Sequence, residues 1–292
     1  MQTVKQLLLA ATLLIGFMFA KADNLWIIGD ATPYGWDTDK ATALLSTPAD
    51  PNVFTGTIYL KGGQEFKFMT QPEWGNDEYG AAPGATLENG TIKLAKGTGD
   101  DGYDKIRVSA DGNYYISLDV ENLTASISLS TYQDTHITLC SLFLVGGATP
   151  GGWSVMQGTP LYQSVEKPYE FSADNLQLSS GSFKIATALK GAGSWNPEYW
   201  YFRDADNSGK IALNQDGDLQ WEITDETKYN VAVNIQAQTI SIKKISTTGI
   251  NNVVSDETVS EYYSLTGIKV TNPHNGLYIR KTGNHTEKVY IP

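Results

Sequence analysis

The sequence predicts an all-β protein, and three observations carry that prediction. Short segments of alternating apolar and polar residues, such as 114–120, recur at a spacing of roughly ten residues. Residues that favour turns separate these segments, and the chain contains 28 glycines. No stretch keeps the 3.6-residue period of an amphipathic helix. Short antiparallel strands of this kind form β-sandwiches, and we expect Ig-like ones.

The chain also contains a tandem repeat. Segments 25–36 and 142–153 both run from an apolar strand through a Gly/Pro turn to a tryptophan, at Trp36 and Trp153. The offset is 153 − 36 = 117 residues. Because other matching positions keep this offset, the sequence predicts two tandem sandwich domains.

The two ends of the chain differ from the repeats. An apolar run at 7–20 follows Lys5, and Ala20-Lys21-Ala22 has the small-x-small pattern of a cleavage site, so we expect a secretory signal. That run is too short for a membrane-spanning helix, and no later stretch is longer. The expected parts are a signal peptide at 1–22, sandwiches at 23–132 and 137–245, a polar linker at 246–261 and a small β-rich C-terminal tail at 262–292.

In the first repeat, one predicted strand places a lysine outside the core. Phe66 and Phe68 share one face of the strand, so Lys67 points to the other face. The segment 70–87 then reads as a long polar loop that carries Trp74 and Tyr79. The expected strands lie at 25–28, 53–60, 64–69, 91–94, about 106–108, 114–120 and 123–129.

The second repeat follows the same path, with expected strands at 169–178 and 182–185 and a closing hairpin at 229–243. Lys184 has the same outward parity as Lys67. The following loop carries Trp195 and Trp200, and the aromatic spacing of the first loop is kept, since 79 − 74 = 5 and 200 − 195 = 5.

Charge and cysteine content narrow the class of partner. The chain has 21 basic and 32 acidic side chains, and its formal net charge of −11 disfavours nucleic acid and anionic lipid. The single cysteine, Cys140, lies in an apolar run and is expected to be a buried, inert thiol. A neutral partner fits this composition best.

The repeated tryptophans suggest a sugar-binding surface. An exposed indole can stack on the apolar C–H face of a sugar ring, and an outward lysine can donate hydrogen bonds to the hydroxyl groups. The alternative is that the tryptophans close the open end of each sandwich. In that case the protein would be a structural or adhesive surface protein that binds no glycan.

Enzymatic chemistry has little support. A glycoside hydrolase needs two carboxylates, and no pair of Asp or Glu residues recurs beside the repeated tryptophans. The three histidines lack metal-ligand spacing. We therefore expect no enzyme activity and no cofactor, with a glycoside hydrolase as the less favoured alternative.

One loop partly matches the pattern of a calcium-binding loop. Asp204, Asp206 and Ser208 occupy positions 1, 3 and 5 of an EF-hand-like pattern, but Gln215 stands where the pattern needs a bidentate glutamate. An ordinary polar turn explains the same composition.

Three motifs of the first repeat, at 29–37, 55–60 and 65–68, resemble the starch-binding domains of the SusE and SusF outer-membrane proteins of Bacteroidetes. The second repeat is similar, so the resemblance covers residues 24 to about 244. It implies non-catalytic modules that bind α-glucan polysaccharide or oligosaccharide at the cell surface, together with other surface proteins of glycan uptake.

In that family, two aromatic side chains and a basic side chain form each site. Carried over by position, the resemblance implies that glycan is bound by Trp36, Lys67 and Trp74 in the first repeat and by Trp153, Lys184 and Trp195 in the second. To these we add one further loop aromatic in each repeat as a candidate glycan-binding residue, Tyr79 and Trp200.

The C-terminal tail resembles the sorting domain of type IX secretion substrates, through segments 263–267, 275–279 and 288–289. The resemblance implies export across the outer membrane and attachment at the surface or release outside the cell. The lipid-anchoring cysteine that is usual in the SusE and SusF family is missing here, so attachment through the tail is our interpretation.

Overall fold

The computed structural model describes residues 24–213, 217–245, 260–265, 269–271, 273–274, 276–282 and 285–291. The chain separates into two compact units, which divide between Ile245 and Ser246. Both repeats lie in the larger unit and the tail lies in the smaller one. The expected signal peptide lies outside the described residues, as do residues 246–259 of the expected linker.

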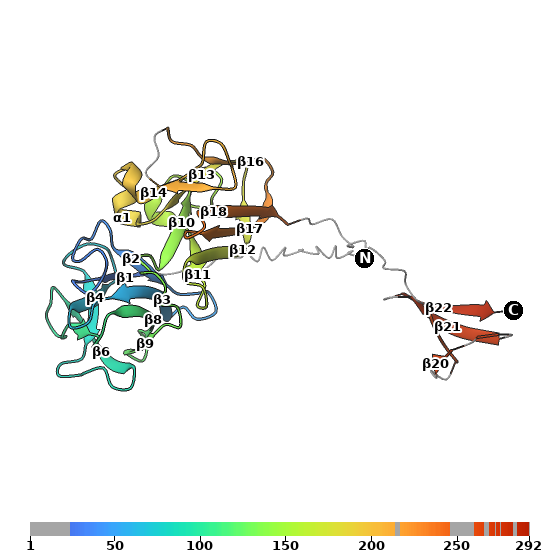
Figure 1. Ribbon diagram of the computed structural model, residues 1–292, viewed down its shortest axis with the longest axis horizontal. Helices are drawn as coiled ribbons and strands as arrows, with labels where there is room; N and C mark the ends of the chain where they lie inside the picture. The colour runs from blue at the N-terminus through green and yellow to red at the C-terminus, as the bar shows by residue number, and fades with distance from the viewer. Residues whose placement is uncertain are drawn as a thin grey trace, which may run out of the picture. The chain divides into compact units, whose positions relative to one another are not determined.

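The first repeat forms nine strands (Figure 1). They are β1 (Asn24–Ile28), β2 (Thr42–Leu45), β3 (Val53–Leu60), β4 (Glu65–Met69), β5 (Asp77–Ala81), β6 (Thr91–Thr98), β7 (Ile106–Arg107), β8 (Gly112–Asp119) and β9 (Thr124–Leu129). Antiparallel pairing runs in the order β1-β2-β3-β8-β9-β6-β5-β4-β7, and β1 also pairs with β4. That pairing joins the first strand of the path to the next-to-last one, so hydrogen bonds connect the two sides of the sandwich there.

The described residues of the second repeat, 137–213 and 217–245, form the same number of strands and three short helical segments. The strands are β10 (Ser141–Val145), β11 (Thr159–Gln163), β12 (Glu170–Leu178), β13 (Gly181–Ala186), β14 (Trp200–Arg203), β15 (Ile211–Leu213), β16 (Trp221–Ile223), β17 (Thr227–Asn234) and β18 (Thr239–Lys244). The helical segments are η1 (Val155–Gln157), α1 (Leu189–Ala192) and η2 (Pro197–Tyr199).

Most strand pairings of the two repeats match, but β6 pairs with β9 in the first repeat, whereas β15 and β18 lie at opposite ends of the strand order in the second. β10 pairs with β11 and β13 as β1 pairs with β2 and β4. β13 pairs with β14 and β16 as β4 pairs with β5 and β7. The all-β class is therefore confirmed, and helix is scarce over the described ranges, as the missing 3.6-residue period predicts.

Each repeat has a hydrophobic core of its own. Phe66 and Phe68 lie in the first core, and Phe183 and Ile185 lie in the second. Cys140 is buried in the first core, and this burial raises the pKa of its thiol, which agrees with an inert role.

A third hydrophobic cluster lies between the repeats. It joins residues on β1, β2 and β4 of the first repeat to residues on β10, β13, β14 and α1 of the second, and Trp36 packs against its edge. Lys190 on α1 also contacts the first repeat, with its Nζ 3.2 Å from a carboxylate oxygen of Asp39 and 2.7 Å from the hydroxyl of Thr38. Contacts of both kinds fix one repeat against the other. The expected boundary at 132–137 falls between β9 and β10.

The structure differs from the expected strands in two ways. Strand β5 lies inside the segment 70–87 that we expected to be a loop, because Asp77–Ala81 pairs with both β4 and β6. The acidic Asp77 and Glu78 at its start hide the strand in the sequence. Strands β2, β11, β14, β15 and β16 were also unexpected, and β14 begins at Trp200, which we expected to lie in a loop. Strand β2 is buried along its whole length, so it lacks the alternation of a half-exposed strand.

The described residues of the tail form a four-stranded antiparallel sheet, in agreement with the small β-rich tail that we expected. The strands are β19 (Glu261–Tyr263), β20 (Lys269–Val270), β21 (Gly276–Thr282) and β22 (His285–Ile291), paired in the order β20-β19-β21-β22. Over the described ranges, none of the helices has the length and apolar character needed to cross a membrane.

Candidate functional site

The turn that precedes the repeated tryptophan has the same geometry in both repeats. The N–H of Gly29 donates to the carbonyl of Gly35, and the N–H of Gly146 donates to the carbonyl of Gly152, each at 2.9 Å. Gly35 has a φ of +60° and Gly152 a φ of +55°, a left-handed conformation that glycine adopts without steric cost. The same backbone therefore holds the tryptophan that follows each turn.

In the first repeat, this turn brings Trp36 beside Trp74. The ring centroids are 6.3 Å apart and the ring planes are tilted by 41°. The Nζ of Lys67 lies 5.9 Å from the ring centroid of Trp36 and 5.0 Å from that of Trp74. These distances lie within the range of a cation–π interaction. Trp74 is 54% exposed, whereas Trp36 is half-buried.

The second repeat brings Trp153, Trp195 and Lys184 together in the same way. The two rings are 6.0 Å apart and tilted by 54°. The Nζ of Lys184 lies 5.9 Å from Trp153 and 5.1 Å from Trp195. The ring separations of the two repeats differ by only 6.3 − 6.0 = 0.3 Å. The structure thus brings the expected pair of tryptophans and the expected lysine together in each repeat.

The lysines are less exposed than we expected. Their side chains are 1% exposed at Lys67 and 7% exposed at Lys184. Both point away from the core of their own repeat, as their parity predicts. They do not extend into solvent, because the tryptophan pair and an acidic partner cover them.

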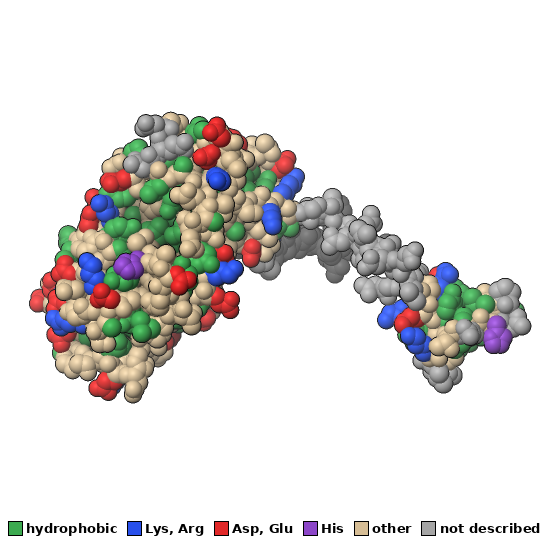
Figure 2. Space-filling model, viewed as in Figure 1, with side chains coloured by type: hydrophobic (Ala, Val, Ile, Leu, Met, Phe, Trp, Pro, Cys, Tyr) green, Lys and Arg blue, Asp and Glu red, His purple; other side chains and the backbone are tan. Residues whose placement is uncertain are grey.

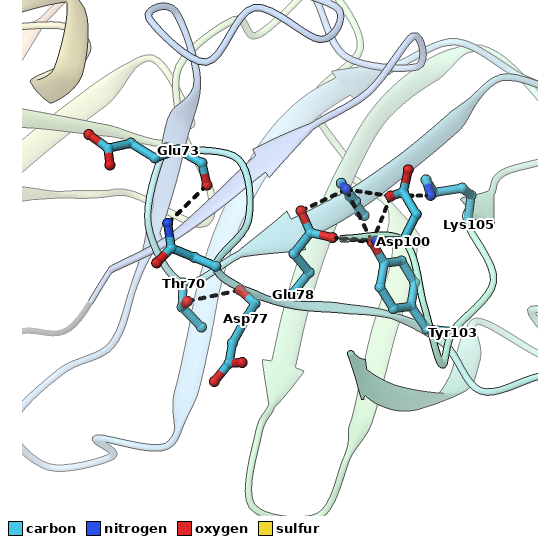
Figure 3. A network of polar contacts seen from close by, with 9 residues as sticks. Thr70, Glu73, Asp77, Glu78, Asp100, Tyr103 and Lys105 are labelled. Carbon is cyan, nitrogen blue, oxygen red and sulfur yellow. Dashed lines mark hydrogen bonds and ion pairs between the residues drawn. The ribbon is translucent and has the colours of Figure 1, made fainter. Parts of the chain in front are cut away.

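A network of polar groups surrounds Lys67. Its Nζ lies 2.7 Å from Oε1 of Glu78, donates to Oδ1 of Asp100 at 2.6 Å and donates to the hydroxyl of Tyr103 at 3.1 Å. Figure 3 shows Glu78, Asp100 and Tyr103 converging on one point, with Lys105 on the far side of Asp100. The hydroxyl of Tyr103 donates to the second oxygen of Glu78.

These contacts shift the pKa of two groups in the network. The hydrogen bond from Lys105, followed by that from Lys67, holds the pKa of the Asp100 carboxyl well below its usual range. Burial raises the pKa of Tyr103, and its hydrogen bond to Glu78 raises it further. Asp100 is therefore ionised and Tyr103 neutral over the physiological range.

Lys184 has different surroundings. Its Nζ donates to Oδ1 of Asp218 at 2.6 Å. It also lies 4.5 Å from the ring centroid of Trp200 and 5.3 Å from that of Phe202. Trp200 is fully buried and stacks on Trp195, with centroids 5.2 Å apart and planes 6° apart.

The strand register shows that Tyr79 and Trp200, which have the same spacing from the preceding tryptophan, are not equivalent positions. Lys67 and Lys184 match at the repeat offset, and β5 and β14 pair beside them. Glu78 lies opposite Met69, and Trp200 lies opposite Ala186, which is Met69's counterpart. Trp200 therefore occupies the place of Glu78, and the equal five-residue spacings do not join equivalent positions.

The counterpart of Tyr79 is Tyr201. Tyr79 lies opposite Phe68 and Tyr201 opposite Ile185, and both tyrosines pack against the core of their repeat. Neither Tyr79 nor Trp200 presents a free ring face to solvent, because both side chains are at most 9% exposed. The ring of Trp200 stacks on the ring of Trp195 instead.

Two aspartates of the site escaped the sequence analysis. Asp100 and Asp218 each pair with the lysine of their repeat at 2.6 Å, and both side chains are about three-fifths exposed, at 60% and 61%. Both have a left-handed backbone, with φ of +69° and +45°. The signal was a Gly-Asp dipeptide that recurs at an offset of 218 − 100 = 118 residues.

The backbone of Trp195 is strained. Its φ is +60°, in the left-handed region that costs a residue with a Cβ atom roughly 1 kcal/mol or more. Such strain persists where surrounding contacts impose it, and it is common at functional sites. Here it accompanies the ring's stacking on Trp200.

The calcium hypothesis stays a prediction. The Oδ1 atom of Asp204 accepts hydrogen bonds from the backbone N–H groups of Asp206 and Asn207, which is the geometry of an ordinary Asx turn. Gln215 lies outside the described residues. In the part of the chain that the structure describes, no group of three His, Cys, Asp or Glu residues could hold a metal ion.

Residues 24–126 match the family model described as SusF/SusE starch specific CBMs, or carbohydrate-binding modules. This range contains the Trp36, Lys67 and Trp74 cluster and confirms the SusE/SusF resemblance of the first repeat. Carbohydrate-binding modules bind sugars without cleaving them, in agreement with a protein that is not an enzyme.

Among solved structures, the crystal structure of SusF from Bacteroides thetaiotaomicron is similar, with 22% sequence identity and a TM-score of 0.26. The match covers 75% of this chain and 47% of that chain, so the present chain spans about half the length of the SusF structure. No curated protein matches the chain.

Proposed function

We propose that this protein is a non-catalytic carbohydrate-binding protein that binds α-glucan through one aromatic platform in each repeat. The platforms are the Trp36–Trp74 pair and the Trp153–Trp195 pair. The observation that carries the proposal is that two indoles and a buried lysine adopt the same arrangement twice. The starch-specific description of the matching family supports α-glucan as the ligand.

The shape of the platforms fits a chain of sugars that turns. The two indole planes are tilted by 41° in the first repeat and by 54° in the second, so sugar rings stacked on both must rotate relative to each other. Neighbouring units of α-linked glucan have such a rotation. The ammonium group behind the rings adds positive charge, and the exposed carboxylates of Asp100 and Asp218 can accept hydrogen bonds from hydroxyl groups.

The charge of the molecule agrees with a neutral ligand. Figure 2 shows acidic side chains at many places on the visible face of the larger unit. With a net charge of −11, the chain repels anionic polymers, whereas a neutral polysaccharide experiences no such repulsion.

Two sites on one chain favour a polymer over a short oligosaccharide. A single site with a Kd of about 1 mM has a binding free energy of only about −4 kcal/mol. A polymer held at one site meets the second at a high effective concentration, which strengthens binding without new contacts.

Affinity electrophoresis in gels that contain amylose, amylopectin or pullulan tests the proposal. We expect the protein to be retarded, and we expect the double variant Trp74→Ala/Trp195→Ala to migrate without retardation. Both tryptophans are about half exposed, at 54% and 47%, so the melting temperature should change little. Tyr290→Ala, which removes an exposed aromatic in the tail, is the matched control and should keep full retardation. Free migration of the unaltered protein in all three gels would reject the proposal.

We also propose that the protein is exported to the cell surface or released outside the cell. Residues 1–22 have the pattern of a secretory signal, and the tail resembles a type IX sorting domain. Antibody staining of intact Bacteroidetes cells expressing the full chain, compared with a chain lacking 262–292, tests both parts. Loss of surface signal on tail removal is the expected result, and unchanged staining would contradict the role of the tail.

A further inference from the structure

We propose that the two sites are unequal, and that the second repeat carries the principal α-glucan site. There, Lys184 donates a hydrogen bond to the bound sugar, whereas the first repeat binds by stacking without help from its lysine. This inference rests on the proposed function and deepens it.

Oxygen atoms of the protein surround the ammonium group of Lys67, which donates hydrogen bonds to Asp100 and Tyr103 and forms an ion pair with Glu78. An ammonium group has three N–H donors. Three oxygen atoms, from Glu78, Asp100 and Tyr103, lie within 3.1 Å of its Nζ. The side chain is 1% exposed, so a sugar hydroxyl could approach only by displacing one of these partners. Displacement would leave a buried charge of Lys67 or Glu78 without its partner, which costs several kcal/mol.

Lys184 keeps donors available. Among the described residues, Asp218 is the hydrogen-bond partner of its Nζ, at 2.6 Å. The remaining neighbours are aromatic rings, which attract the charge through their faces but do not replace an oxygen acceptor. The side chain is 7% exposed between the two stacking rings. A hydroxyl of a sugar on those rings would meet a desolvated, charged donor.

One exchange accounts for this difference. Glu78 on β5 and Trp200 on β14 occupy equivalent places beside the lysine. The carboxylate in the first repeat neutralises Lys67 from within the protein. The indole in the second repeat leaves the positive charge unmatched on that side and supports the ring of Trp195.

Stacking on Trp200 also orders the ring of Trp195 before a ligand binds. Trp195 lies parallel to Trp200, and its backbone is held at a φ of +60°. A ring that is already ordered loses less conformational freedom when a ligand binds. Trp74 stands 54% exposed and contacts Trp36 at a tilt. Stacking in the first repeat therefore carries a larger ordering cost.

Single-site proteins test the inference. Trp74→Ala leaves the second site intact, and Trp195→Ala leaves the first. In calorimetric titrations with maltoheptaose, we expect Trp195→Ala to bind at least tenfold more weakly than Trp74→Ala. A hydrogen bond from a charged group contributes about 1.5–3 kcal/mol, which corresponds to tenfold or more in Kd. Equal affinities, or a stronger first site, would overturn the inference while leaving the proposed function intact. Failure of the unaltered protein to bind maltoheptaose and all three polysaccharides would reject both.

A second pair of variants isolates the lysine. In the Trp74→Ala background, Lys184→Gln should weaken binding of maltoheptaose about tenfold. Its partner Asp218 is 61% exposed and can return to water, so the variant should fold. Lys190→Gln in the same background removes a nearby lysine that pairs with Asp39, and it should leave affinity unchanged. Equal effects of the two substitutions would show that Lys184 does not contact the sugar and would overturn the inference.

Discussion

The two repeats share most of their strand pairings, their turns and the positions of three site residues, yet the central lysine has different partners in each. In the first repeat, Lys67 belongs to a buried ion pair with Glu78, and in the second, Lys184 lies against Trp200. The difference arises at one equivalent position on β5 and β14. It shows that a duplicated backbone can preserve the shape of a binding platform while one side chain changes the chemistry beneath it.

The sharpest contrast between the repeats should appear on removal of the lysine. Lys67→Met leaves Glu78 buried with its charge unpaired, and we expect a loss of about 3–5 kcal/mol in unfolding free energy. Lys184→Met leaves only the exposed Asp218, so the loss should be about 1 kcal/mol or less. Urea denaturation followed by tryptophan fluorescence measures both. Equal losses would show that the buried pair does not distinguish the repeats.

The turns should reveal what the repeats have in common. Gly35→Ala and Gly152→Ala both place a Cβ at a residue with a left-handed backbone and open space around it. Each substitution should therefore lower the unfolding free energy by about 1 kcal/mol.

Gly29→Ala and Gly146→Ala should lower the unfolding free energy by more. The new Cβ would lie 2.2 Å from the carbonyl oxygen of Glu65 on β4 in the first variant, and 2.2 Å from that of Ser182 on β13 in the second. Thermal melting of the four variants checks both points. The shared turn geometry would be contradicted if the two members of either pair differed by more than a few degrees.

The smallest expected effect is a pH dependence confined to the first repeat's network. The folded-state pKa of Asp100 is lowered, mainly by Lys105 and Lys67, so its contribution to stability is present above the unfolded pKa of about 3.9. That contribution is lost as the pH falls towards the folded-state pKa. Melting temperatures recorded from pH 5 to pH 2 should fall less steeply for Asp100→Asn than for the unaltered protein. Identical slopes would show that Asp100 adds nothing to acid sensitivity.

The sequence predicted the duplication, the turns and the pairing of tryptophans with a lysine, because each leaves a local pattern. It could not predict how exposed the lysines are. Parity tells which face of a strand Lys67 occupies, but the covering of that face depends also on Asp100 and Tyr103, which are 33 and 36 residues away in sequence.

The strand register was the second feature that the sequence could not predict. The five-residue spacing suggested that Tyr79 and Trp200 are equivalent, whereas the strand pairs match Tyr79 with Tyr201. Loops of different length precede β5 and β14, so spacing along the chain does not give position in the sheet. The Asp100 and Asp218 pair was missed for the same reason, since the offset there is 118 rather than 117 residues.

The hydrophobic cluster between the repeats has a consequence for how a long glucan is held. Side chains of β1 and β4 pack against β10, β13 and α1, and Lys190 of α1 contacts Asp39, three residues beyond Trp36. The separation of the two platforms is therefore set by packed side chains rather than by a linker. A linker would make the effective concentration at the second platform depend on its length and stiffness. If both platforms bind as proposed, that concentration is a fixed property of the fold, and we expect glucan segments that span the two platforms without bending to be favoured over those that must bend.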